Sequence, residues 1–198
     1  MISGFSGAGK GTLVKKMMEL YDNFALSVSM TTREPRPGEV HGKDYFFVTK
    51  EEFEATIHEG GFIEHACYCG NYYGTPKAYV EQKLAEGKDV ILEIDVQGGT
   101  QVKGKNPDAV LLFVTPPSAQ ELKRRLKGRG TEDDETIRKR LVRAVDEVEY
   151  MQQYDFIAVN DQLEDCAREV YNIVAAVKNT PGRNKAFVSQ ILTELKSL

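Results

Sequence analysis

The chain has 198 residues, a length that fits one domain with inserted segments and allows a sizeable buried core. Its 41% hydrophobic and 28% charged residues are ordinary for a globular protein, and its net charge of −4 argues against a general nucleic-acid binder, which needs a positive face. Its apolar runs are too short to span a bilayer, and an odd number of cysteines does not suggest a disulfide framework. We therefore expect a cytoplasmic protein with no signal peptide, membrane span or nucleic-acid partner.

The segment from Met1 to Thr12 predicts a phosphate-binding loop (P-loop). A short apolar strand leads into a glycine-rich turn, and the periodicity after Lys10 indicates a helix rather than a flexible end. The pattern Gly-x-x-x-x-Gly-Lys between a strand and a helix presents backbone N–H groups, a lysine and a helix dipole to the phosphates of a nucleoside triphosphate. The residues expected to form this site are Gly4, Phe5, Ser6, Gly7, Ala8, Gly9, Lys10, Gly11 and Thr12. The pattern is broken at Gly11, where Ser or Thr normally reaches Mg²⁺; the hydroxyl comes one residue later, at Thr12.

Apolar periodicity and turn residues predict the rest of the secondary structure. In the first half of the chain, the predicted elements are a helix at 10–20, strands at 24–29 and 45–49, a helix at 50–59, and strands at 62–69 and 71–73. In the second half, they are helices at 76–86, 96–105, 118–127, 131–152 and 163–177, and strands at 89–95, 109–115 and 156–159. Strands separated by helices predict right-handed crossovers and a parallel sheet covered on both faces.

Two further predictions concern helices in the second half of the chain. The helix at 131–152 would begin with a capping box of Thr131 and Asp134. Its apolar stripe, expected to face the core, consists of Ile137, Leu141, Ala144, Val145, Val148 and Met151. The tail after residues 180–182 has apolar residues at the same spacing: Phe187, Ile191, Leu192 and Leu195. We expect this tail to pack back on the core; the alternative is a partner-binding surface.

A second anion site is predicted in the aperiodic loop at 29–44. The polar residues expected to form it are Ser29, Arg33 and Arg36 in the loop, with Tyr45 and Tyr73 as phenolic donors. Arginines three residues apart in an extended loop can converge on one phosphate with bidentate hydrogen bonds. The alternative is that the two arginines are solvated surface. A serine and two tyrosines in the same irregular insertion favour the site.

Charged residues at two further places indicate phosphoryl transfer. Arg125, Arg129 and Arg140 surround the glycines at 128 and 130, and a glycine-flanked arginine can swing towards substrates and stabilise the charge of a moving phosphoryl group. The alternative is a solvated helix face paired with acids such as Glu135 and Glu147.

Glu93 and Asp95 end a predicted buried strand. The carboxyl ends of parallel strands face the ligand crevice, so one of these two carboxylates is expected to hold Mg²⁺ through water.

Together, these blocks resemble the guanylate kinase family over roughly residues 1–178. The matching blocks are Gly4–Thr12, Ser27–Glu39, Gly42–Phe47, Phe62–Glu64, Gly70–Thr75, Ile94–Gly98, Arg129–Glu132 and Val159–Asp161. The resemblance implies an α/β fold of three layers, a P-loop NTPase with a parallel core sheet at 1–29, 80–124 and 153–178. It also implies an inserted, mostly antiparallel GMP-binding domain at 30–79 and a helical lid at 125–152, leaving 179–198 as a C-terminal helical tail.

The resemblance also implies a reaction, in which ATP with Mg²⁺ phosphorylates GMP or dGMP, and a role for each matching residue. The GMP-binding residues would be Ser29, Arg33, Arg36, Tyr45 and Tyr73 at the phosphate, with Glu64, Thr75 and Glu93. ATP would be bound by the P-loop residues with Arg125, Asn160 and Asp161. The catalytic residues would be Lys10, Arg36, Arg129 and Arg140, and Mg²⁺ would be held by Thr12 and Asp95 through water.

The chemistry of the bases supports guanine independently. Guanine presents N1–H and its 2-amino group side by side, and the Glu64 carboxylate can accept from both. Adenine lacks these donors and would leave a buried carboxylate unpaired, which discriminates strongly.

Other functions stay open on the sequence alone. The alternatives are a phosphopeptide-binding guanylate-kinase-like module and a nucleoside monophosphate kinase of other base specificity. We expect a monomer or a small homo-oligomer. His65, Cys67 and Cys69 alternate on one strand face, and we interpret them as packing and exposed polar groups rather than a zinc site, because no fourth ligand lies nearby in sequence.

Overall fold

The structure is a computed structural model that describes residues 1–68, 70–128 and 133–198. Its core is a sheet of parallel strands, which among the described residues are β1 (Ile2–Gly4), β2 (Phe24–Leu26), β7 (Asp89–Ile91), β8 (Leu112–Thr115) and β9 (Phe156–Val159). The groups β1-β8-β9 and β2-β7 meet where the Ile2 N–H donates to the Leu92 carbonyl at 2.8 Å. The resulting order, β2-β7-β1-β8-β9, puts the strand that precedes the P-loop at the centre of the sheet.

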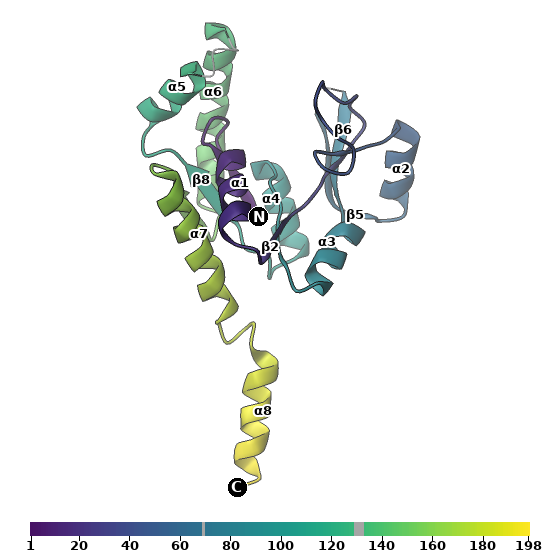
Figure 1. The fold of residues 1–198 in the computed structure, drawn as a ribbon, viewed down its shortest axis with the longest axis vertical. Helices are drawn as coiled ribbons and strands as arrows, with labels where there is room; N and C mark the ends of the chain where they lie inside the picture. Colours follow the sequence, from purple (N-terminus) through teal and green to yellow (C-terminus); the bar gives the residue numbers. More distant parts are fainter. Residues whose placement is uncertain (69, 129–132) are drawn as a thin grey trace.

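Helices cover the sheet and bury its apolar residues (Figure 1). They are α1 (Lys10–Leu20), α4 (Val96–Lys105), α5 (Ala119–Gly128) and α7 (Leu163–Lys178). Leu13 and Met17 on α1 and Phe113 on β8 are completely buried. The parallel sheet between helices confirms the expected α/β fold. Strands β2, β7 and β8 are shorter than their apolar runs suggested, whereas β9 has the predicted bounds.

A smaller lobe stands beside the core, to the right in Figure 1. Its strands are β3 (Met30–Thr31), β4 (Phe46–Phe47), β5 (Phe62–Tyr68) and β6 (Asn71–Pro76), in the order β4-β3-β6-β5, and only the β3–β4 pair is parallel. Helix α2 (Lys50–His58) packs Phe53 between the rings of Phe62 and Tyr72, and α3 (Lys77–Ala85) returns the chain to the core. The other elements lie close to the predicted stretches, but β3 was not predicted, and β6 extends to Pro76, beyond the predicted 71–73.

The long helix α6 (Asp134–Met151) corrects two predictions. Its N-cap is Asp133, whose carboxylate accepts from the Thr136 N–H at 2.7 Å, whereas Thr131 lies outside the described residues. Asp133 takes this place because a short carboxylate suits the N-cap at least as well as a threonine hydroxyl. Val145 and Val148, predicted to face the core, are 69% and 49% exposed, because α6 rests on the core along a narrow stripe that contains Ile137 and Ala144.

The tail does not pack back on the core, so that prediction was wrong. Helix α8 (Lys185–Lys196) extends away from the molecule, and none of its residues, all within the described part of the chain, is buried (Figure 1). The turn before it is held by the Asn184 side chain, which donates to the carbonyls of Lys178 at 2.7 Å and Thr180 at 2.9 Å. These bonds fix the turn so that α8 continues downwards from the end of α7 and Phe187 stays 61% exposed. No helix within the described ranges is both long and apolar enough to cross a membrane.

Candidate active site

The P-loop joins β1 to α1 through a backbone that only glycine accommodates. Gly7 and Gly9 have φ angles of 91° and 89°, in the left-handed region. A Cβ on Gly9 would lie 2.7 Å from the side-chain nitrogen of Asn160, and one on Gly4 would lie 2.0 Å from the Val114 carbonyl oxygen. The loop therefore fits closely against β8 and the residue after β9.

Side chains from distant elements fix this loop. Asn160, which is 5% exposed, donates its amide N–H to the Ala8 carbonyl at 2.9 Å. The Lys10 ammonium donates to the carbonyls of Gly4 at 2.7 Å and Phe5 at 3.1 Å, so it lies across the loop as an anion-binding lysine does. Arg140 on α6 donates to the Ser6 hydroxyl, and Arg125 on α5 reaches the Ala8 carbonyl at 3.4 Å. Helices α5 and α6 therefore each contact the P-loop through one arginine.

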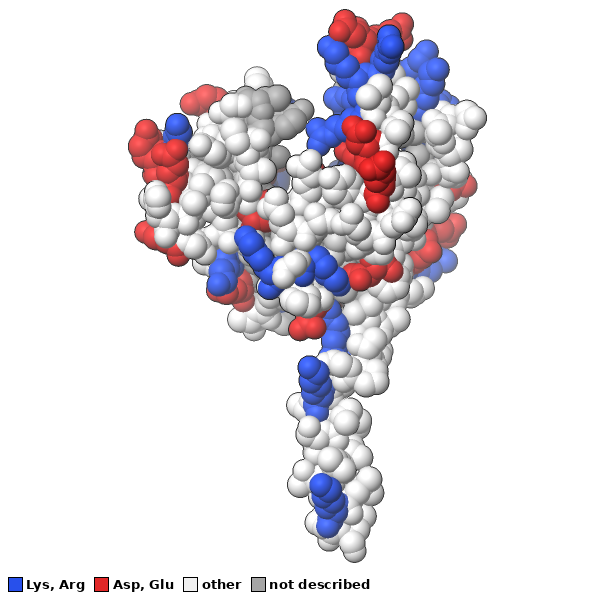
Figure 2. All heavy atoms as spheres, turned by 180° about the vertical axis from the view of Figure 1, so that it is seen from behind, with Lys and Arg blue, Asp and Glu red and all other residues white. Residues whose placement is uncertain are grey.

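A cavity of about 750 Å³, the P-loop cavity, opens in front of the loop. Its wall combines the loop, the ends of β2 and β7, and the inner face of α6. The lining includes Gly4, Ser6, Lys10, Ser29, Tyr45, Glu93, Asp95, Arg140, Arg143 and Glu147. Basic side chains gather on the lid above this region, across a hollow from the small lobe (Figure 2).

A second cavity of about 290 Å³, the small-lobe cavity, adjoins the first. It is lined by Ser29, Tyr45, Glu64, Ala66, Tyr73, Gly74, Glu93, Ile94, Asp95 and Arg143. Six of these residues line both cavities: Ser29, Tyr45, Glu93, Ile94, Asp95 and Arg143. The two cavities are therefore parts of one cleft, which runs from the P-loop to the sheet of the small lobe.

Glu64 and Thr75 form a buried polar pair at the far end of this cleft. Glu64 is 8% exposed and accepts a hydrogen bond from the Thr75 hydroxyl at 2.7 Å. Burial raises the pKa of the Glu64 carboxyl, although the Thr75 bond opposes the shift. One carboxylate oxygen keeps the Thr75 bond, and the acid lines the small-lobe cavity, where it can accept from a ligand. The resemblance assigned both residues to the binding of GMP, and the structure joins them by a hydrogen bond.

The loop arginines occupy a different place from the one expected. Arg33 forms a bidentate pair with Glu39, at 3.0 and 2.9 Å, and lies over the Tyr45 ring, 5.4 Å from its centre. This pairing holds the pKa of Glu39 below its usual value. Arg36 is exposed, and its backbone N–H donates to Glu39 at 2.7 Å. Among the described residues that line the two cavities, neither arginine is present, so they stand beside the site rather than in it.

Glu93 and Asp95 both line the two cavities but have different neighbours. A Cβ on Gly11 would lie 3.8 Å from a Glu93 carboxylate oxygen, so Glu93 stands next to the P-loop. Partial burial raises the pKa of Glu93, while the nearby Lys10 ammonium opposes the shift. Asp95 caps α4 by accepting from the Gly98 N–H at 2.7 Å. A Cβ on Gly98 would lie 3.3 Å from Asp95 and 3.4 Å from Glu64, so these two carboxylates share a wall.

The remaining predicted residues are less informative. Arg129 lies outside the described residues, as does Cys69, while Thr12 and Asp161 are exposed. Asn160 contacts the loop backbone, a role that its position in the sequence did not suggest. His65 contacts the rings of Phe53 and Phe62, and within the described ranges no group of three His, Cys, Asp or Glu side chains could hold a metal.

Arg143 and Glu147 are site residues that the sequence analysis missed. Both line the P-loop cavity, although Glu147 was considered only as an exposed ion-pair partner. The available signal was their spacing: they follow Arg140 by three and seven residues, on the same face of a helix.

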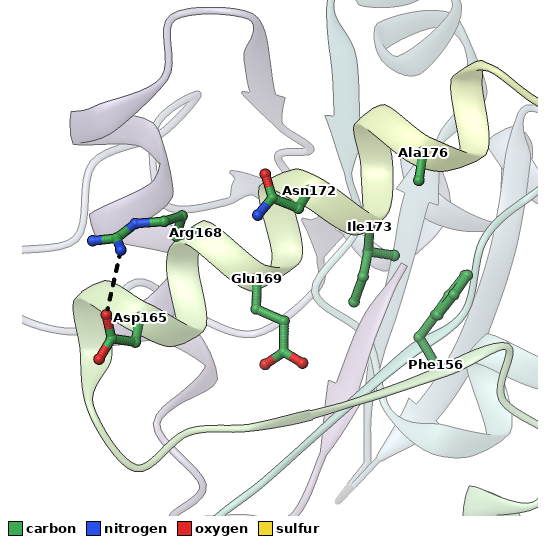
Figure 3. Close-up of a pocket in the computed structure, with 7 residues that line it drawn as sticks. All are labelled: Phe156, Asp165, Arg168, Glu169, Asn172, Ile173 and Ala176. Carbon is green, nitrogen blue, oxygen red and sulfur yellow. Dashed lines mark ion pairs between the residues drawn. The ribbon is translucent and has the colours of Figure 1, made fainter.

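A shallow hollow on the outer side of α7 lies apart from this cleft (Figure 3). Phe156 and Ile173 form its apolar part, and Asp165 pairs with Arg168 at 3.7 Å at its edge. It shares no described residue with the two cavities. We assign it no part in the site.

The chain is similar to guanylate kinases in sequence and in structure. The family model described as guanylate kinase matches residues 1–177. A guanylate kinase of Lactiplantibacillus plantarum is 48% identical over 198 residues, covering 100% of this chain and 96% of that protein. One from Lactococcus lactis is 54% identical over 176 residues, covering 89% and 86%. The crystal structure of guanylate kinase from Anaplasma phagocytophilum superposes with a TM-score of 0.73 at 34% identity, covering 92% of this chain and 86% of that one.

Because the sequence match covers nearly the whole chain and the fold agrees, the resemblance read from the motifs is confirmed. The chain belongs to the guanylate kinase family of ATP:GMP phosphotransferases.

Proposed function

We propose that the P-loop cavity binds ATP, that the small-lobe cavity binds GMP, and that the γ-phosphoryl group passes between them where the two cavities join. The observation that carries this assignment is the continuous cleft from Lys10 to the buried Glu64. It provides a cationic end for a triphosphate and a carboxylate end for guanine. dGMP is an acceptor as well, because the proposed contacts are to the base and the phosphate rather than the ribose.

At the ATP end, the backbone N–H groups of the loop and the Lys10 ammonium bind the phosphates. The bonds from Asn160 and Arg140 to the loop hold it in position, so ATP binding requires little reorganisation. Arg125 and Arg140 then stand at the loop from the lid side and stabilise the charge that spreads over the phosphoryl group during transfer. Arg129, which lies between α5 and α6 in the sequence, has the same proposed role.

At the GMP end, Glu64 accepts from guanine N1–H and the 2-amino group, and Thr75 keeps the carboxylate in place. Ser29, Tyr45 and Tyr73 line the cavity as hydroxyl donors for the phosphate. Arg33 and Arg36 reach the phosphate only if the small lobe moves towards the core, because both lie beside the cavity in this structure. Such a closure also excludes water from the transfer.

Mg²⁺ fits the loop end of the cleft. Glu93 provides the carboxylate next to the P-loop, and Thr12 lies in the first turn of α1, which follows the loop. Both side chains offer oxygen atoms of the kind that Mg²⁺ binds beside phosphates. We propose that Glu93 holds the ion through water and that Asp95 serves the guanine side with Glu64. The ion would neutralise charge on the ATP phosphates. If Glu93→Gln needs several-fold more Mg²⁺ for half-maximal rate, the assignment of Glu93 to Mg²⁺ is supported. If Asp95→Asn shows this effect instead, the roles of the two carboxylates are exchanged.

The deciding experiment measures ADP release with ATP and a panel of GMP, dGMP, AMP, CMP and UMP. We expect turnover with GMP and dGMP at least about 100-fold above the others in kcat/KM, because a buried polar readout rejects a base without matching donors. Equal rates across the panel would remove the guanine assignment.

A further inference from the structure

The inner face of α6 carries a polar stripe that faces the cleft. Its residues, at helical spacing, are Thr136, Lys139, Arg140, Arg143 and Glu147, and all of them line the P-loop cavity. Arg140 is accounted for by its bond to Ser6. The pair of Arg143 and Glu147 has no role in the proposed function so far.

Arg143 stands where the two cavities meet, because it lines both of them. The small-lobe cavity contains the carboxylates of Glu64, Glu93 and Asp95, and among its described lining residues Arg143 is the one Lys or Arg. A phosphate monoester entering this cavity is repelled by the carboxylates and needs a cation near it. Arginine suits that position because its planar guanidinium binds phosphate oxygens bidentately.

Glu147 holds Arg143 in a way that a surface acid would not. Its carboxylate accepts from Arg143 Nε at 3.1 Å, and the Glu147 side chain is only 11% exposed. The ordinary i,i+4 pair on the same helix, Lys139 with Glu135, has both side chains more than 70% exposed, at 74% and 73%. Exposed pairs contribute little to stability, and a buried carboxylate costs desolvation, so burial of Glu147 indicates a positioning role rather than helix stabilisation.

We propose that Arg143 binds the phosphate of the acceptor nucleotide at the point of transfer, and that Glu147 is the residue that positions it. The proposal rests on the assignment of the small-lobe cavity to a nucleoside monophosphate. Arg143 on α6 already lies in the cleft. The loop arginines Arg33 and Arg36 lie beside the cleft and have to move to reach the phosphate. The ligand chemistry is that of a nucleoside monophosphate dianion.

The test compares steady-state kinetics of the full chain with GMP varied at saturating ATP, and then with ATP varied at saturating GMP. Arg143→Ala should raise KM for GMP about 10-fold or more and lower kcat, because it removes charge-assisted bonds to phosphate. KM for ATP should stay within about two-fold. Arg143→Lys should restore part of the loss, since it keeps the charge without the bidentate geometry.

Glu147→Gln tests the positioning role. It should raise KM for GMP by about three-fold to five-fold, and it should add little to Arg143→Ala in the double variant, because residues that act through one another are not additive. Arg138→Ala is the matched control: it removes an exposed arginine of α6 that lines neither cavity among the described residues, and it should leave both KM values unchanged. Thermal unfolding of each variant shows whether the fold is retained.

Two results overturn the proposal. In one, Arg143→Ala changes KM for GMP no more than Arg138→Ala while the wild type phosphorylates GMP; the proposed function then stands and the role of Arg143 falls. In the other, Arg143→Ala raises KM for ATP as much as that for GMP, which would place Arg143 at the donor. A wild type that does not use GMP would instead overturn the proposed function, and this inference with it.

Discussion

The two ends of the cleft are built in different ways. At the loop end, the glycine backbone is pinned by Asn160, and the Lys10 ammonium already lies over the loop. At the lobe end, Glu64 and Thr75 are fixed, but Arg33 is paired with Glu39 outside the cavity. The end proposed to bind ATP is therefore preorganised, whereas the end proposed to bind GMP is only half assembled.

This difference has a physical cause. A triphosphate is bound mainly by backbone N–H groups, which a single loop can supply between one strand and one helix. A nucleoside monophosphate needs base and phosphate contacts from several strands, and these come together only when two lobes approach. Variants at the loop end should therefore affect every turnover, and variants at the lobe end should affect the choice and affinity of the acceptor.

Lys10→Ala should have the largest effect of the variants considered. Removal of the ammonium at the P-loop takes away a preorganised charge at the transferred phosphates, and kcat should fall about 10³-fold. KM for GMP should change little, because Lys10 lies at the other end of the cleft. Steady-state assays test this, with Lys15→Ala, an exposed lysine of the same helix, as the control. A loss confined to KM for GMP would contradict the division of the cleft.

Glu64→Gln should come next, and its effect should be confined to the acceptor. We expect kcat/KM for GMP to fall about 10²-fold to 10³-fold, because the amide cannot accept from both guanine donors. ATP binding, measured by calorimetry, should be unchanged. Glu59→Gln, an exposed acid of the same lobe, is the control. A variant that keeps normal GMP turnover would remove Glu64 from base recognition.

The pH dependence of GMP affinity follows from the same residue. In the proposed role, the ionised carboxylate accepts from the guanine donors. Burial raises the pKa of Glu64, so KM for GMP should rise as pH falls through a value above the ordinary Glu pKa. A raised folded-state pKa also means that ionisation opposes folding above that pKa and that the penalty disappears at lower pH. Glu64→Gln should remove the pH step in KM and should not lower the melting temperature near neutral pH. A KM for GMP independent of pH in the wild type would contradict this role.

The sequence was most informative where the site is contiguous. The P-loop and its helix follow from one stretch of chain, and β7 and β8 were predicted because buried parallel strands are continuous apolar runs. The sequence could not show whether Glu93 or Asp95 lies next to the P-loop. Their side chains are two residues apart, and which of them faces the P-loop depends on how the chain turns from β7 into α4, which the structure alone shows.

Contacts between segments far apart in the chain also could not be predicted from the sequence. Asn160 was expected to bind ATP, and the structure shows that its amide donates to a loop carbonyl from the end of β9. Glu147 was named only in the alternative of a solvated helix face, as an acid that could pair there, although it lines the cleft. In both cases the residue type favours a ligand or solvent, and only the tertiary position reveals a supporting contact.

Asn160→Ala tests how much of the loop's order depends on that contact. The variant leaves the buried Ala8 carbonyl without its amide donor, a loss of about 1–3 kcal/mol, so the melting temperature should fall by about 2–10 °C. KM for ATP should rise about 10-fold, with a smaller change in KM for GMP. Asn172→Ala, at an exposed position on α7, should change neither quantity. If KM for GMP rises more than KM for ATP, Asn160 supports the acceptor end and the comparison between the two ends has to be revised.

Removal of residues 184–198 should have the smallest effect. This segment contains α8, whose residues are all described and none of which is buried, so the truncated chain should keep kcat/KM within about two-fold and its melting temperature within about 1 °C. The contrast is Val170→Ala on the preceding helix, where Val170 is 1% exposed and loss of packing should lower the melting temperature by several degrees, about 1–3 kcal/mol. The family match ends at residue 177, before α8, which agrees with a core that is complete without it. A truncated chain that melts several degrees earlier would show that the apolar side of α8 is covered in solution, since exposed side chains alone cannot supply that stability.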